Sequence, residues 1–468
     1  MGMSLNSALQ IAASGVNAYQ AAISVTSENI SNINTPGYTT QTAVLETAAQ
    51  PASSGSLSVG SGVTVTSIQR SYDAYLQTQI DNSQTTQGYD TANSTMLQEI
   101  QPSFNEVNSD GIGTAISTFF NAWQNVADDP TSTANRQSVV TAAQTLADNF
   151  NSVSNTLSSD ITSLNTSLGT TTSSINQSLA SIAQLNSQIK VITESGGNAN
   201  VLEDQQDEAV QNLAKQIGIT GTQNSDGTMD IKFTDTGDAL VSGSQAGSFS
   251  LTTDAVTGLN DVNLTPAGSA ASSAVSPVSG QLGATMVLMN TTIPGYQNQL
   301  NSLASTIATA VNTQQGAGYD LNGNSGAALF TSSTSAPISA ATISLNPAIT
   351  TSQIAAASAS NSGDGNSALT MANLANDTTQ MGGQTFSGYY NSLVSKVGQD
   401  VQTSKNAVTQ GAAYSNQLST LQQSNSGVSL NQELINLTTY QQSYGASAKV
   451  IVAVNNMMND LLAMIAAA

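Results

Sequence analysis

The feature that most constrains the fold is a regular spacing of apolar residues at both ends of the chain, in alternating steps of four and three. Near the N-terminus this spacing predicts one continuous helical seam. Its positions are Leu5, Leu9, Ala12, Val16, Tyr19, Ile23, Thr26, Ile30 and Ile33. Such a seam is typical of coiled coils and is narrower than the stripe that a helix buries on a globular core.

The C-terminal residues repeat the pattern in a second long predicted helix. Its seam runs through Leu430, Leu434, Leu437, Gln441, Tyr444, Ala448, Ile451, Asn455, Met458, Leu462 and Ile465. Both helices carry Ser, Asn, Gln and Ala on their outward faces, where a coiled coil in water usually carries Lys and Glu. One interpretation is a helical hairpin that closes a globular domain. The other, which we favour, is that the two ends pair and their seam residues also contact other subunits.

A polar stretch, "SENISNINTPGYTTQ" from Ser27 to Gln41, follows the first seam. Proline disfavours helical geometry in the residue before it, and glycine favours a turn. We therefore expect the first helix to end near residues 32–35. The residues that we assign to the turn are Asn29, Asn32, Asn34, Pro36, Gly37 and Tyr38.

Between the two ends, the period of the apolar residues changes from helical to alternating and back. We predict a mainly α fold with small inserted β domains, terminal coiled-coil helices and a long helical bundle, arranged as an elongated multidomain rod. The expected units are 1–40 with 428–468 (terminal helices), 56–218 with 282–316 and 362–425 (helical bundle), 219–281 (inserted β domain), and 317–361 (an irregular or β insertion, either separate or part of the outer β domain). An alternating segment at 59–70 predicts a strand.

The bundle is predicted from two helical regions, 114–213 and 369–421, with one break at residues 128–130 in the first. Phe119, Phe120 and Trp123 fall on one helical face in a segment that contains the only Trp of the chain. Large aromatic side chains contribute most of their energy when they are buried. We assign these three residues to the bundle core.

Composition excludes several kinds of catalytic site. The 468 residues include no Cys and no His, which rules out zinc–thiolate and haem–histidine sites, Cys nucleophiles and the Ser-His-Asp arrangement. The sequence also has no phosphate loop, dinucleotide fingerprint or nucleophile elbow. We predict a protein that is not an enzyme, with no catalytic residues, no cofactor and no metal ion.

One acidic stretch is a candidate catalytic or metal site, which would contradict that prediction. "LEDQQDE" places Glu203 over Asp207 and Asp204 over Glu208 at helical spacing. Paired carboxylates act as acid and base or bind a metal ion. Because charge runs usually lie on the surface, we interpret this stretch as a solvated helix face.

Charged residues are scarce and mostly acidic. Eight Lys and Arg against 29 Asp and Glu give a formal net charge of −21, which repels phosphate backbones, so nucleic acid is not an expected partner. The final stretch, "VIVAVNNMMNDLLAMIAAA", is the most similar to a membrane span. Asn455, Asn456, Asn459 and Asp460 would be costly in lipid, so we expect no membrane insertion.

The segments at 27–41 and 59–80 resemble the flagellar axial proteins, which include rod, hook and hook-associated subunits. Three further segments, at 119–150, 294–330 and 426–465, resemble the hook–filament junction members of that family. The resemblance covers most of the chain and fades across 222–278 and 331–361. On the residues alone, a hook or rod subunit and a secreted acidic adhesin or hydrolase remain alternatives.

The resemblance implies a structural subunit that links hook to filament and is needed for filament assembly. The terminal helices would form the inner tube of a helical ring of copies. The hook protein would lie below this ring, and a second junction protein and the filament would lie above it. The subunit would be secreted through the flagellar type III export apparatus. A cytoplasmic export chaperone would bind its C-terminal helix beforehand.

Overall fold

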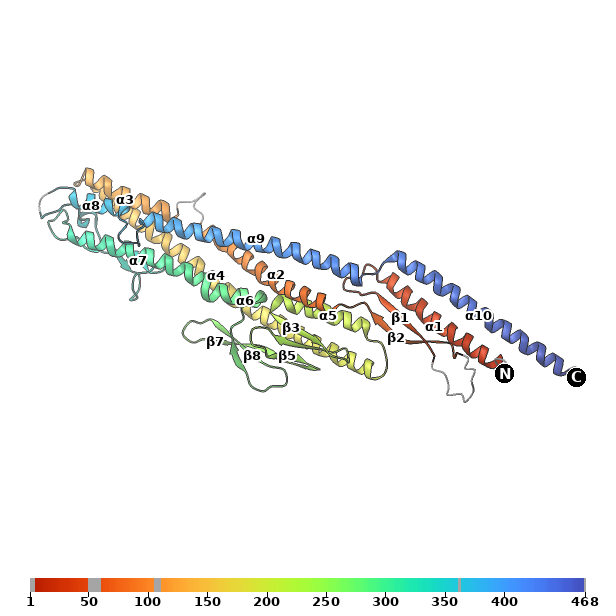
Figure 1. Cartoon of the computed structure of the whole chain (residues 1–468). Coiled ribbons are helices and arrows are strands. Elements are labelled where there is room, and N and C mark those ends of the chain that lie inside the picture. The colour runs from red at the N-terminus through yellow and green to blue at the C-terminus, as the bar shows by residue number, and fades with distance from the viewer. Residues whose placement is uncertain (1–4, 49–59, 105–110, 361–362, 467–468) are drawn as a thin grey trace.

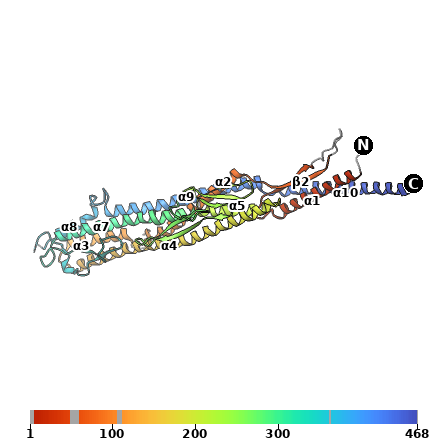
Figure 2. The same ribbon diagram turned by 90° about the horizontal axis from the view of Figure 1, so that it is seen from below.

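A computed structural model describes residues 5–48, 60–104, 111–360 and 363–466. The molecule is a long rod, with both termini at one end and helix α8 near the other (Figure 1). Figure 2 shows the same elongated shape from below. The predicted fold class, a mainly helical rod with small inserted sheets, is confirmed.

The elements follow one another from helix through sheet and back to helix. In chain order they are α1 (Leu5–Ser31), β1 (Gln41–Thr47), β2 (Val63–Arg70), α2 (Ala74–Ile100), η1 (Gln101–Phe104), α3 (Ile112–Asp128), α4 (Thr133–Glu194), α5 (Asn200–Gln216), β3 (Ile219–Gln223), β4 (Met229–Phe233), β5 (Ala239–Ser242), β6 (Gln245–Ala246), β7 (Ser248–Thr253), β8 (Asn260–Thr265), β9 (Ser273–Val275), α6 (Gly280–Val287), η2 (Leu288–Thr292), α7 (Ile293–Ala317), β10 (Phe330–Ser332), β11 (Ile343–Leu345), η3 (Thr351–Gln353), α8 (Asn366–Asn373), η4 (Leu374–Asn376), α9 (Phe386–Ser426) and α10 (Leu430–Ala466).

The two ends of the chain form one unit, which we call the terminal unit: α1, β1, β2 and α10. Helices α1 and α10 run antiparallel side by side, with the rings of Tyr19 and Tyr440 stacked at 6.4 Å between centroids (Figure 1). The β1–β2 hairpin packs on another face of α1. This corrects the predicted division of the chain, which missed β1 and placed β2 in the bundle. The boundary expected at residue 56 lies outside the described residues.

The rest of the chain, which we call the body, is built along α4. This helix has 62 residues and contacts α3, α5, α6 and α7. The predicted break at residues 128–130 is present, but a second break at 195–199 separates α5 from α4. Gly196 occupies the left-handed region there, with φ 77°. The helix expected from residue 369 is also interrupted, because α9 begins only at Phe386.

The aromatic residues assigned to the bundle core lie at the end of the body that is distant from the termini. Phe119, Phe120 and Trp123 are at most 2% exposed. The ring of Phe120 stacks on that of Phe386 of α9 at 5.9 Å, and Phe119 contacts Phe330 of β10 at 5.7 Å. The aromatic segment therefore joins helix α3 to two segments that follow it by more than 200 residues.

The inserted strands form small antiparallel sheets on the side of the body. One sheet has the order β3-β4-β5-β6 and another has the order β7-β8-β9. Strands β10 and β11 form a separate sheet. Asn151 near the start of α4 holds the β11 segment, whereas Asn186 near the end of α4 holds β4. The insertion at 317–361 is thus not part of the 219–281 β domain.

Candidate assembly interface

Small residues let the other elements of the terminal unit approach α1 closely. The residues of α1 that are buried within the chain are Ala12, Gly15, Ala18, Ala22, Val25, Thr26 and Asn29. A Cβ added at Gly15 would lie 2.8 Å from the Oγ of Ser447 on α10. The face of α1 that the chain itself covers is therefore shifted from the predicted seam. Of the seam positions in α1, only Ala12 and Thr26 are buried.

The remaining large residues of the N-terminal seam are only partly covered. Those that are half-buried are Leu5, Leu9, Val16, Tyr19, Ile23, Ile30 and Ile33. The exposed positions of α1 are polar, among them Asn6, Gln10, Asn17, Gln20 and Ser24. Helix α1 thus buries a small-residue face, leaves its large apolar residues at the margin and turns a polar face to solvent.

Helix α10 is far less covered than α1. Only Glu433 and Val454 are buried along its 37 residues. Of its large apolar seam residues, Leu437 and Ile451 are half-buried against the α1 side. The others, Leu430, Leu434, Tyr444, Met458, Leu462 and Ile465, are between 38% and 71% exposed. An apolar surface of this length on a solvent-exposed helix marks an interaction site.

The polar turn after α1 is fastened by a side-chain amide. Asn29 is buried; its Nδ2 donates to the Gln41 carbonyl at 2.8 Å, and its Oδ1 accepts from the Gln41 N–H at 3.0 Å. The Tyr38 hydroxyl donates to the same Oδ1 at 2.9 Å. These bonds close the loop between α1 and β1. Asn32 is half-buried, whereas Asn34, Pro36 and Gly37 lie exposed in the turn.

An ionic cluster connects this turn to the body. Thr39 donates from its backbone N–H and its hydroxyl to Asp204 of α5, at 3.0 and 2.7 Å. The guanidinium of Arg70, at the end of β2, pairs with Glu203 at 2.8 Å, with Asp204 at 3.1 Å and with Asp207. We call these three acidic residues the carboxylate cluster.

The carboxylate cluster corrects our interpretation of the acidic stretch as a solvated face. Its three side chains are at most 16% exposed, and that of Arg70 is 4% exposed. Of the four acidic residues in the stretch, only Glu208 is exposed. The helical spacing did not reveal this, because the partner lies more than 130 residues earlier in the chain. The one signal in the sequence for this buried cluster was that arginine is rare, because the chain has only two.

Burial sets the electrostatics of the cluster. It raises the pKa of Asp207 to about 6, although the charge of Arg70 acts in the opposite direction. It likewise raises the pKa of Tyr72, whose ring lies 4.3 Å beneath the guanidinium of Arg70. In the part of the chain that the structure describes, no group of His, Cys, Asp or Glu is arranged to hold a metal ion. The arrangement serves as a structural fastening.

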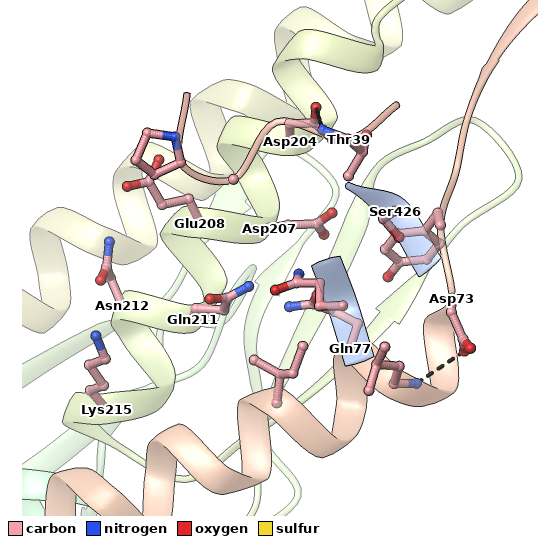
Figure 3. Close-up of a pocket in the computed structure, with 16 residues that line it drawn as sticks. Thr39, Asp73, Gln77, Asp204, Asp207, Glu208, Gln211, Asn212, Lys215 and Ser426 are labelled. Atoms are coloured by element: carbon pink, nitrogen blue, oxygen red, sulfur yellow. Dashed lines mark hydrogen bonds between the residues drawn. The ribbon is translucent and has the colours of Figure 1, made fainter. Parts of the chain in front are cut away.

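A cavity of about 220 Å³ adjoins the cluster, at the joint between terminal unit and body. Figure 3 shows Asp207 pointing from α5 into this space, with Thr39 and Ser426 on its far side and Gln77 below. The chain crosses the joint at residues 71–73, between β2 and α2, and at residues 427–429, between α9 and α10. The Ser71 hydroxyl ties the two crossings together by donating to the Asn425 carbonyl at 2.8 Å. The Ser426 carbonyl also accepts from the Thr40 N–H of the turn after α1 at 2.8 Å.

The chain has an extended body and a terminal helix pair in which most of the apolar surface of α10 is uncovered. These features are those of a subunit that assembles with others. Two matches show the class. Residues 9–39 match the family described as "Flagella basal body rod protein", and residues 422–464 match "Flagellar basal body rod FlgEFG protein C-terminal". The chain is a structural component of the bacterial flagellum, of the axial class. It associates with other flagellar axial proteins.

A third match covers the body. Residues 97–330, half of the chain, match the family "Flagellar hook-associated protein FlgK helical domain". The chain belongs to the flagellar hook-associated protein FlgK family. The family predicted from the sequence motifs is thereby confirmed.

Individual relatives align over almost the whole chain. "Flagellar hook-associated protein 1" of Escherichia coli (strain K12) is 27% identical, over 98% of this chain and 100% of the relative. The protein of the same name in Bacillus subtilis (strain 168) is 24% identical, over 97% of each. The solved structure of the flagellar hook junction protein FlgK from Burkholderia pseudomallei matches with a TM-score of 0.67 at 18% identity. That match covers 74% of this chain and 100% of the other.

Proposed function

We propose that the protein is the structural subunit that joins the flagellar hook to the filament, and that its copies assemble into a helical ring through α1 and α10. The relatives named hook-associated protein 1, aligned from end to end, support the junction role. The uncovered apolar surface of α10 is the observation that carries the assembly role. The role is structural and requires no catalytic residue or cofactor.

The distribution of side chains around α10 indicates neighbours on several sides. With about 100° between successive residues, one narrow stripe lies opposite the α1 contact and is polar and exposed. It consists of Asn431, Thr438, Gln442, Lys449, Asn456 and Asp460. Apolar residues flank the stripe on both sides, with Leu434 and Val452 on one flank and Ile435 and Leu461 on the other. This arrangement suits a helix in the wall of a tube, where neighbours pack against both flanks and one edge is exposed to solvent.

The same surface accounts for the proposed partners. A solitary subunit exposes the apolar residues of α10, so we expect a cytoplasmic export chaperone to cover them until the chain enters the type III export apparatus. After secretion, the extracellular subunit would contact the hook protein below. A second junction protein, on the side of the filament, would lie above.

Part of α10 is long and apolar enough to cross a membrane, by length and composition alone. We propose protein neighbours rather than lipid for this surface. The polar stripe continues through it, and Asn455, Asn459 and Asp460 would each be costly in the bilayer.

A complementation experiment tests the proposal. In a host strain without this gene, we expect hooks that lack filaments and flagellin released into the medium, and the intact gene should restore filaments. Leu434→Asp with Val452→Asp should not restore them, because charges on a flank of α10 would be buried unpaired between subunits. Electron microscopy of isolated hooks and the flagellin content of the medium are the readouts.

Thr438→Asp on the polar stripe is the matched control and should restore filaments. Normal filaments in the strain without the gene would contradict the junction role, and a strain without hooks would favour a hook or rod subunit instead. Full rescue by the Leu434 and Val452 double variant would contradict the assembly surface.

A further inference from the structure

The length of the terminal helices magnifies any error in the angle at which they leave the body. Helix α10 has 37 residues and is therefore about 55 Å long. A rotation of about 10° at the joint would move its free end by about 10 Å, which is about the diameter of a helix. A ring in which α10 packs against neighbouring copies therefore needs a joint that fixes this angle closely.

The apolar cores on the two sides of the joint are separate in the part of the chain that the structure describes. The terminal unit has the small cluster built on Ala22, Val25 and Ala43, and α2 and α9 form another small cluster at the near end of the body. Cavities of about 220 and 590 Å³ lie beside the joint. The angle therefore depends on directional polar contacts.

Several of these contacts locate the end of the β1–β2 hairpin on the body. Nδ2 of Asn198, just before α5, donates to the Ile68 carbonyl at 2.8 Å, and Nδ2 of Asn200 donates to the same carbonyl at 3.1 Å. A carbonyl oxygen accepts hydrogen bonds over a broad range of directions. The two amides thus hold the position of β2 more closely than its direction.

The guanidinium of Arg70 fixes direction as well as position. Its Nε pairs with Glu203 at 2.8 Å, and its Nη1 pairs with Asp204 at 3.1 Å and with Asp207. Because these bonds leave one rigid plane in different directions, the plane cannot turn without breaking at least one of them. The Cζ of Arg70 also lies 4.3 Å over the ring of Tyr72, so the crossing at residues 71–73 is tied to the same plane.

We propose that Arg70 is a positioning residue for assembly: its guanidinium sets the angle between the terminal unit and the body at which α10 meets its neighbours. This role rests on the assembly proposed for α1 and α10. The side chain of Arg70 is 4% exposed, so the fastening lies within the single chain and is in place before neighbours arrive.

A triple variant removes the guanidinium without leaving its partners charged. Arg70→Met with Glu203→Gln and Asp207→Asn, which we call the neutral-joint variant, keeps side chains of similar length and avoids burying two carboxylates without their cation. Asp204 keeps its two bonds from Thr39. Arg70→Lys is the conservative variant, because it keeps the charge but not the planar fork.

Distance measurement between two spin labels tests the angle in the solitary subunit. The chain has no native cysteine, so Thr193→Cys on α4 and Asn17→Cys on α1, both exposed, can be labelled in the full-length protein. We expect a single narrow distribution with Arg70 in place. Asn17 lies about 20 Å along α1 from the joint, so freedom of about 10° in the neutral-joint variant should broaden the distribution by up to about 4 Å. An unchanged width would overturn the proposal.

Two controls separate a free angle from unfolding. A label pair within the terminal unit, Asn17→Cys with Thr42→Cys on β1, should keep its width in the neutral-joint variant, and broadening of this pair would overturn the proposal. Lys396→Met removes an exposed ion pair with Asp400 at 3.1 Å on α9, away from the joint. It should leave both widths unchanged.

Filament restoration tests whether the angle serves assembly. In the strain without the gene, the neutral-joint variant should be secreted but should not restore filaments, and Arg70→Lys should restore them only partly. Full restoration by the neutral-joint variant, despite a broadened distribution, would overturn the positioning role. Normal filaments in the strain without the gene would instead contradict the junction role, whatever the distances show.

Discussion

Asn186 shows how a chain with few charges holds its inserted strands in place. The side chain is fully buried on α4; its Nδ2 donates to the carbonyls of Met229 and Gly243, at 2.8 and 2.6 Å. Its Oδ1 accepts from the Met229 N–H at 2.8 Å and from Gln206. Asn176 fastens β7 in the same way, through the N–H and carbonyl of Phe249. A neutral amide satisfies a strand backbone without the desolvation cost of a buried charge.

Asn186→Ala should lower the free energy of unfolding by about 2–4 kcal/mol, because it leaves buried backbone groups of the β domain without partners. Chemical denaturation followed by circular dichroism measures this. Asn155→Ala, on the exposed side of the same helix, is the control and should change the stability by less than about 0.5 kcal/mol. Equal effects of the two substitutions would show that the buried amide is not a fastening.

At the scale of elements, close approach between helices decides where glycine is required. Gly88 lies in the middle of α2, where an added Cβ would be 1.9 Å from the Lys215 carbonyl oxygen at the end of α5. The contact is with backbone, which cannot rotate away. Glycine has a low helix propensity, so local preference does not explain Gly88. The close packing of α2 on α5 does.

Gly88→Ala should therefore destabilise the protein, by roughly 1–3 kcal/mol or more, despite the better helix propensity of alanine. Gly398→Ala on α9 is the matched control, because nothing lies within 4 Å of its added Cβ. That change should raise stability by about 0.5–1 kcal/mol. Thermal unfolding of the two variants checks the opposite signs, and a stabilised Gly88 variant would contradict the close contact.

At the scale of the whole molecule, stability is unevenly distributed. The body has one extensive apolar core, whereas the terminal unit has a small cluster and a nearly uncovered α10. Regions with few buried apolar contacts open first, so the terminal unit should be the least stable part of a solitary chain.

Limited proteolysis of the monomer should trim both ends and leave a resistant body that extends from about residue 71 to about residue 426. Mass spectrometry of the fragments identifies the boundaries. Because the β1–β2 hairpin belongs to the terminal unit, its removal together with α1 is a specific expectation. Termini that resist digestion as long as α4 does would contradict the uneven stability.

The sequence by itself determined the helical ends, the turn after Ser31 and the helical–β–helical order of the middle. These features depend on local spacing and on Pro and Gly, which act within a few residues. Even locally, some signals were overlooked: Gly196 and Gly197 end α4, and "QTAVLET", an apolar run between polar residues, forms β1.

Only the tertiary structure decided that Arg70 meets Glu203, Asp204 and Asp207, that Asn186 fastens β4, and that the face of α1 covered within the chain is the small-residue one. Each of these depends on which distant segment lies alongside, because a buried charge or amide is stable only where the fold supplies its partner. No spacing within one segment encodes the identity of that partner.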